Sequence, residues 1–156
     1  MAFERAHGLA ADGVAGPKVW QALLAATAAG QSNTQGYSYA LVSENSPETL
    51  TVWHNGQVVL TSLANTGISG LATTVGTFPI YLRYRTQTMQ GVNPNGTPYR
   101  DPGIPYVNYF KGGEAIHGYV RASYGFPQSL GCVELPIPNA AAAWPWLHYG
   151  TLVTVQ

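Results

Sequence analysis

The chain has 156 residues, enough for one domain with a full hydrophobic core and a short appendage. Only 9% of the residues are charged, and seven basic residues balance seven acidic ones, so the composition does not favour binding to nucleic acid or to an anionic membrane. The 46% share of hydrophobic residues, with ten Tyr and four Trp, excludes a disordered chain. No apolar stretch approaches the length of a membrane span, and no signal peptide is visible at the start of the sequence.

The N-terminal residues 1–30 predict a helix, a tight loop and a second helix. Apolar residues recur at helical spacing before Gly8, which is suited to ending the first helix. Pro17 suits the first position of the second helix, whose apolar residues form one stripe. Residues 31–36 are polar and predict a linker, so we expect the main domain to cover residues 37–156.

Beyond the linker the hydrophobic pattern alternates, which predicts strands. The Asn55-Gly56 pair predicts a hairpin turn, and the Gly- and Pro-rich residues 91–105 predict a long loop that covers or binds a ligand. An Ala-rich helix is expected to begin with Asn139 as its cap and to end near Pro145. The fold class is therefore mainly β and mainly antiparallel, with a short helix near the C-terminus. The expected strands cover residues 39–42, 49–53, 57–63, 76–84 (with Pro79 at an edge or bulge), 107–110, 114–117 and 152–155.

A lone cysteine carries the clearest functional signal. Cys132 lies in the run Ser-Leu-Gly-Cys-Val at residues 129–133, fifteen positions after His117 (132 − 117 = 15). One cysteine cannot form an internal disulfide, so it is either a small buried hydrophobe or a reactive thiol. Gly131 allows the backbone to approach a bound group and frees an N–H beside the sulfur. An imidazole within hydrogen-bond reach would make a thiolate–imidazolium pair accessible, and the sequence is consistent with such a pair.

These positions resemble the motif of the bacterial L,D-transpeptidases, which cross-link peptidoglycan. The motif is His-Gly, a loop, then Ser-x-Gly-Cys and a hydrophobic residue, and here it falls on His117-Gly118 and residues 129–133. The resemblance covers residues 37–156 and implies the β-sandwich or barrel of that catalytic domain. Supporting similarity lies at residues 73–78, 105–110, 115–118 and 150–155. The N-terminal segment, in residues 3–9, 12–17 and 20–23, resembles the second half of a helical peptidoglycan-binding domain.

The resemblance also implies roles for single residues. Cys132 would be the nucleophile and His117 the general base, with the carbonyl of Gly118 orienting the imidazole. The N–H groups of Cys132 and Gly131 would stabilise the oxyanion of the tetrahedral intermediate. Other residues implied in oxyanion or substrate binding are Ser129, Tyr106, Tyr109 and Glu134.

Two positions depart from the family pattern. Glu134 stands where the family commonly has Arg, and an acidic group facing the cleft would repel substrate carboxylates. Thr74 stands where the family often has Pro.

The implied reaction is acyl transfer in two steps. The thiolate would attack the carbonyl between the third residue and the terminal D-alanine of a donor stem tetrapeptide, and D-alanine would leave. An amine of a neighbouring acceptor stem would then resolve the thioester and form the cross-link. The resemblance implies these two stem peptides as partners and reactivity toward carbapenems, with no cofactor and no metal. We expect an extracytoplasmic location, in the cell wall or periplasm, with the signal sequence outside this chain.

The sequence is compatible with other functions. With water as the acceptor, the same site would be an L,D-carboxypeptidase, and a non-catalytic peptidoglycan-binding module is a candidate from another class. Papain-type peptidases place Cys before His and sortases separate the two further, so both fit less well. A zinc site would draw on His117, Cys132, Glu134 and His148, whose spacing follows no familiar metal-site pattern.

Overall fold

The computed structural model describes residues 2–34 and 36–156, so Met1 and Gln35 of the predicted N-terminal segment and linker lie outside the described residues. The chain divides into two compact units, Met1–Tyr37 and Ser38–Gln156. The first unit contains the helices α1 (Ala2–Ala6) and α2 (Pro17–Ala28), as the sequence predicts. Among the described residues, no helix combines the length and the apolar character that crossing a membrane requires.

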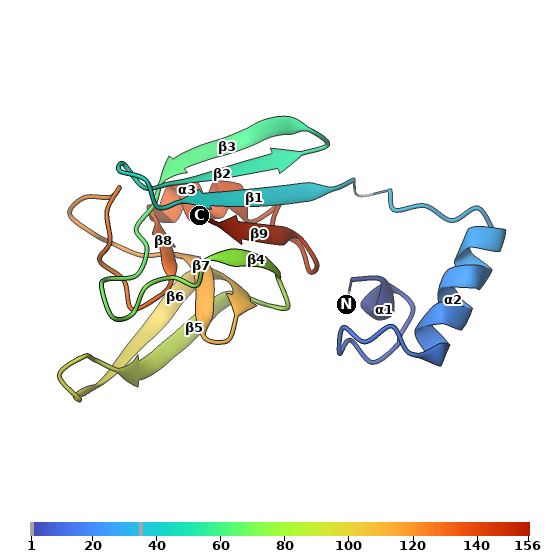
Figure 1. The fold of residues 1–156 in the computed structure, drawn as a ribbon, viewed down its shortest axis with the longest axis horizontal. Helices are drawn as coiled ribbons and strands as arrows, with labels where there is room; N and C mark the ends of the chain where they lie inside the picture. Colours follow the sequence, from blue (N-terminus) through green and yellow to red (C-terminus); the bar gives the residue numbers. More distant parts are fainter. Residues whose placement is uncertain (1, 35) are drawn as a thin grey trace. The chain divides into compact units, whose positions relative to one another are not determined.

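The second unit consists of two β-sheets and one short helix (Figure 1). The first sheet has the strand order β3-β2-β1-β9-β4, with β9 parallel to β1 and the other neighbours antiparallel. Asn55 and Gly56, both with positive φ, turn the chain between β2 and β3, which confirms the predicted hairpin. The bounds are Ser38–Ser43 (β1), Thr49–His54 (β2), Gln57–Leu63 (β3), Gly76–Pro79 (β4) and Leu152–Val155 (β9).

The second sheet carries the residues of the cysteine motif. Its strand order is β5-β6-β7-β8, and β8 runs parallel to β7. The helix α3 (Ile137–Ala143) follows β8 and packs against β3, β6 and β7. The predicted fold class, mainly β with a short helix near the C-terminus, is confirmed. The bounds are Leu82–Val92 (β5), Pro98–Lys111 (β6), Glu114–Gly118 (β7) and Val133–Leu135 (β8).

The two sheets share one main hydrophobic core. Its fully buried side chains come from strands of both sheets, from α3 and from the segment after it. Along β1 and β2 they alternate with half-buried positions, whereas β8 is buried throughout. The core therefore fixes the second sheet against the first and gives the cysteine motif a rigid base. The largest of these core side chains are Val42, Leu50, Val52, Ile80, Ile116, Val133, Leu135, Leu147, Val153 and Val155.

The predicted long loop at residues 91–105 is wrong. Most of this segment extends β5 and β6 into a two-stranded antiparallel ribbon that projects beyond the rest of the sheet (Figure 1), with its turn at residues 93–97. The short strand β7 pairs with β6 only from Asn108 onward, so among the described residues the distal half of β6 has a neighbouring strand on one side alone. A proline can turn its missing N–H to an open edge, which is why Pro98 and Pro102 do not prevent a strand here.

Two local predictions are also corrected. The single strand expected at residues 76–84 ends at Pro79, and the chain crosses to the second sheet before β5 begins. Asn139 does not cap α3, because the helix begins at Ile137 and Asn139 lies inside it. Pro138 is accepted in the first turn, where its missing N–H is not needed. The Asn139 amide instead donates to the Ser62 hydroxyl of β3 at 2.7 Å.

A buried carboxylate holds the loop between β3 and β4. Glu48, 2% exposed, accepts hydrogen bonds from the N–H and the hydroxyl of Thr66 at 2.7 and 2.8 Å. Asn65, the residue before Thr66, exchanges two main-chain hydrogen bonds with Glu134 of β8, at 2.9 and 3.0 Å. Glu48 therefore fixes the loop against which the strand after the cysteine is paired.

We expect Glu48→Ala to lower the free energy of unfolding by about 3 kcal/mol, because both donors of Thr66 would remain unpaired in the interior. Thr66→Val removes only the hydroxyl and should cost about 1 kcal/mol. Urea unfolding of the two variants measures both values. Equal losses in the two variants, or none in Glu48→Ala, would contradict the assigned role.

Candidate active site

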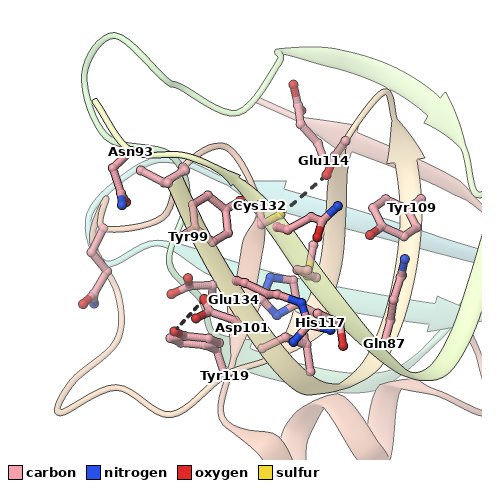
Figure 2. A pocket seen from close by; sticks show the side chains of 18 of the residues that line it. Gln87, Asn93, Tyr99, Asp101, Tyr109, Glu114, His117, Tyr119, Cys132 and Glu134 are labelled. Carbon is pink, nitrogen blue, oxygen red and sulfur yellow. Dashed lines mark hydrogen bonds between the residues drawn. The ribbon is translucent and has the colours of Figure 1, made fainter. Parts of the chain in front are cut away.

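The cleft of the second unit has a volume of about 900 Å³ and contains the motif residues. Its lining comes from the β5–β6 ribbon, from β7 and the segment after it, and from the residues leading into β8. Figure 2 shows Cys132 and His117 inside the cleft, with the cysteine between Tyr99 and Tyr109 of β6. The ribbon that the sequence predicted as a loop is thus one wall of the site.

The parallel register of β7 and β8 brings the two motif residues together. Ile116 lies opposite Val133 and His117 opposite Glu134, so Cys132 falls next to the start of β7. Side chains two residues apart in a strand share a face of the sheet. Cys132 and Glu134 therefore stand on the same face as His117, and all three line the cleft. The fifteen-residue separation in the sequence is closed by one crossover connection.

His117 is buried and neutral. It is 4% exposed, and its Nδ1 lies 3.1 Å from the carbonyl oxygen of Gly118. A carbonyl only accepts hydrogen bonds, so Nδ1 carries the proton and Nε2 is left as the basic nitrogen. Burial lowers the pKa of His117, while the Gly118 carbonyl and the charge of Glu134 act against that shift. The ring at neutral pH is therefore a free base of fixed tautomer, held by the residue that the sequence nominated for this purpose.

Cys132 is a protonated thiol in the free protein. Burial raises its pKa to about 12, and the charges of Glu134 and Glu114 add to the shift, whereas a hydrogen bond from the Ala115 backbone opposes it. The Sγ atom donates to the carbonyl of Gly113 across 3.8 Å. The resting state is therefore a neutral thiol beside a neutral imidazole, and a thiolate–imidazolium pair has to form during reaction.

The turn before the cysteine is held by a serine. The Ser129 hydroxyl accepts from the N–H of Gly131 at 3.1 Å and donates to the carbonyl of Cys132 at 2.6 Å. Gly131 has φ 109°, a conformation that favours glycine. The Gly131 N–H is bonded to Ser129 here, so its use as an oxyanion donor stays a prediction that requires this bond to break. The N–H of Cys132 has no hydrogen-bond partner within residues 2–34 and 36–156 and can serve as the donor.

The structure separates the two tyrosines that the sequence nominated. Tyr109 lines the cleft, and burial raises its pKa. Tyr106 does not line the cleft: its ring lies 6.0 Å from that of Trp144 and 4.4 Å from the guanidinium carbon of Arg85. Side chains three residues apart in a strand point to opposite faces of the sheet, which agrees with this difference. Tyr106 also has the unusual φ of 58°.

The sequence did not predict several residues of the cleft. Tyr99 and Asp101 line the cleft but lie in the segment that the sequence predicted as a loop. The Tyr119 hydroxyl donates to the Asp101 carboxylate at 3.2 Å, and this hydrogen bond connects the ribbon to the segment after β7. Arg121 follows shortly after the His-Gly motif, which was the available signal. The carboxylate of Glu114 accepts from the N–H and the hydroxyl of Thr74 at 3.0 and 2.6 Å, so the threonine that replaces the family's proline has a partner in the site.

No group of three or more His, Cys, Asp or Glu side chains in the described residues is placed to bind a metal ion. His148, one of the four residues of the zinc alternative, is not among those that line the cleft.

Residues 37–155 match the model of the L,D-transpeptidase catalytic domain family. The chain belongs to this family. A comparison with curated proteins gives no match. The resemblance seen in the sequence is thereby confirmed for the main domain, whereas the likeness of the N-terminal segment to a peptidoglycan-binding domain stays a prediction.

Solved structures share the fold of this family member. An L,D-transpeptidase from Mycobacterium smegmatis is 22% identical over 78% of this chain and 59% of its own, with a TM-score of 0.68. L,D-transpeptidase 3 from Mycobacterium tuberculosis is 19% identical over 78% of this chain and 60% of its own, with a TM-score of 0.70. The catalytic domain of the E. faecium enzyme is 24% identical over 80% of this chain and 100% of its own, with a TM-score of 0.68. The chain thus spans about 59% of the length of the first of these proteins.

The raised pKa of Cys132 predicts the pH dependence of its alkylation in the free protein. Below a pKa of about 12 the thiolate fraction grows with pH, so the rate with iodoacetamide should rise about tenfold per pH unit from about pH 7 to about pH 11. Intact mass spectrometry measures the rate, and the chain unfolded in urea should level off above the ordinary pKa of 9.0. A plateau in the folded protein below about pH 8 would show a resting ion pair instead.

Proposed function

We propose that this chain is the catalytic part of a peptidoglycan L,D-transpeptidase in which Cys132 is the nucleophile and His117 the general base. The observation that carries the proposal is the β7–β8 register, which places the thiol and a neutral imidazole of fixed tautomer in one cleft. Membership of the family supports the reaction class. Because peptidoglycan lies outside the cytoplasmic membrane, we also propose that the protein acts in the cell wall or periplasm.

The first half-reaction forms a thioester. His117 Nε2 accepts the thiol proton while Sγ attacks the carbonyl carbon between the third residue and the terminal D-alanine of the donor stem peptide. The Cys132 N–H stabilises the oxyanion. Collapse breaks the C–N bond, the departing amine takes the proton from Nε2, and D-alanine leaves. A low pKa of His117 suits this return of the proton, because a weakly basic ring holds it only briefly.

The second half-reaction restores the enzyme. The amine of an acceptor stem peptide attacks the thioester carbonyl and loses its proton to Nε2 of His117. The C–S bond then breaks, the new amide is released, and the sulfur of Cys132 takes the proton back. Water in place of the amine would give a carboxypeptidase through the same steps, with a free carboxylate as the product.

Solved relatives support reactivity toward β-lactams. L,D-transpeptidase 3 of M. tuberculosis was solved with a faropenem-derived adduct, and an L,D-transpeptidase 25% identical to this chain, with a TM-score of 0.70, was solved in complex with imipenem. We propose that a carbapenem likewise acylates Cys132, because its strained carbonyl is attacked by the same thiol.

Imipenem should therefore form one covalent adduct per chain, seen as a mass increase in intact mass spectrometry. Cys132→Ala should give none, and His117→Gln should slow acylation by about a hundredfold or more, because general-base help of this kind accounts for factors of that order. Circular dichroism checks that both variants fold. An adduct on Cys132→Ala, or no adduct on the natural chain, would contradict a catalytic thiol. Retained binding to peptidoglycan sacculi without any adduct would favour the non-catalytic module.

A disaccharide-tetrapeptide incubated alone and with a second stem peptide separates transfer from hydrolysis. We expect a cross-linked product that has lost D-alanine and is absent with Cys132→Ala, because the thioester forms only on the thiol. Liquid chromatography with mass detection distinguishes it from the hydrolysed tripeptide. A tripeptide as the sole product, at every acceptor concentration, would assign the site to an L,D-carboxypeptidase.

A further inference from the structure

Glu134 forms a paired, two-point contact with Arg121. Nε and Nη2 of the arginine donate to the two carboxylate oxygens of Glu134, each at 2.8 Å. Glu134 is 5% exposed, so its charge lies out of water and depends on this partner. The expected repulsion of substrate carboxylates by Glu134 does not arise, because the guanidinium neutralises it within the cleft.

Two further contacts fix the orientation of Arg121. Its Nη2 also donates to the carbonyl of Gln128 at 3.2 Å, and its guanidinium carbon lies 4.7 Å from the centre of the Tyr119 ring. Its side chain is 31% exposed and lines the cleft. The N–H groups of Nη1 have no partner in the described part of the chain. A guanidinium held on one edge, with donors unused on another, is suited to bind a second carboxylate.

The other charged residues of the cleft are less suited than Arg121 to bind a carboxylate beside the catalytic ring. Glu114 is bonded to Thr74 and Asp101 to Tyr119. Arg100, the other cation of the lining, is exposed on the distal half of the ribbon. Arg121 instead contacts Glu134, the register partner of His117, so its charge lies beside the catalytic ring. The fall that Arg121 causes in the pKa of His117 agrees with this proximity.

We propose that Arg121 binds the free α-carboxylate of the terminal residue of the donor stem peptide, with Glu134 as its positioning residue. The inference rests on the proposed function, in which His117 protonates the departing amine of that residue. In an α-amino acid one carbon separates the amine from the carboxylate. The group that binds the carboxylate must therefore lie next to the group that protonates the amine, and Arg121 does.

Two donors that differ only at this carboxylate test the inference: a stem tetrapeptide with terminal D-alanine and its primary amide, D-alaninamide. For the natural chain we expect kcat/KM to favour the acid by about tenfold to a hundredfold, the range of a charge-assisted hydrogen bond. Mass-detected release of D-alanine or D-alaninamide measures both rates. Equal kcat/KM for the two donors would overturn the inference without any variant, while the proposed function would stand. Release from neither donor would count against the proposed function itself.

The matched variant removes both charges of the pair. Arg121→Gln alone would leave the buried Glu134 carboxylate unpaired, so the double variant R121Q/E134Q is used. It should lose the preference for the acid, so that kcat/KM becomes equal for the acid and the amide, because the group that distinguishes the two donors has been removed. A preserved acid preference in the folded double variant would overturn the role of Arg121.

Arg100→Gln serves as the charge control. It removes a cation from the same cleft without touching the Glu134 pair, so the ratio of kcat/KM for acid over amide should stay as in the natural chain. Loss of the preference in Arg100→Gln, with the preference kept in R121Q/E134Q, would assign carboxylate binding to the ribbon instead. Thermal unfolding followed by circular dichroism establishes that each variant is folded at the assay temperature.

Discussion

The parallel pairing of β7 with β8 is the constraint on which the site depends. Only three residues of β8 take part, yet their register sets Cys132, His117 and Glu134 on one face of the sheet. A slip by one residue would turn the side chains of β8 to the opposite face. Asn65 prevents such a slip by pairing with Glu134 from the other side, and the buried Glu48 holds the loop that carries Asn65 through Thr66.

Burial governs the electrostatics of the paired residues. It raises the pKa of Cys132 and lowers that of His117, so the same loss of water keeps both groups neutral before substrate arrives. The Gly118 carbonyl fixes which imidazole nitrogen is basic, and the Ala115 backbone provides the hydrogen bond that favours the thiolate. Charge is thus formed only as the new bond to sulfur forms, in a site where the donors are already oriented.

Local signals predicted much of the fold, and pairing between distant segments accounts for what they missed. The turn between β2 and β3 is determined by two adjacent residues, Asn55 and Gly56. The spacing of His117 and Cys132 likewise spans a single connection. The ribbon at residues 91–105 was missed because Pro and Gly ordinarily end strands, and only the absence of a second neighbour makes them acceptable there. The bond between Gly131 and Ser129 likewise depends on a turn geometry that residue types alone do not determine.

Glu134 brings a negative charge to a position where the family commonly has arginine, and the fold pairs it with the positive charge of Arg121. Glu134 and Arg121 are thirteen residues apart (134 − 121 = 13), and they meet because the chain crosses from β7 to β8 between them. Burying a carboxylate is costly unless a partner satisfies it, and here two parallel hydrogen bonds do so. The same contacts immobilise the guanidinium before any ligand binds, which removes part of the entropic cost of ordering a long side chain. Glu134 therefore does not leave the cleft without a cation, because its carboxylate holds the guanidinium of Arg121 in place.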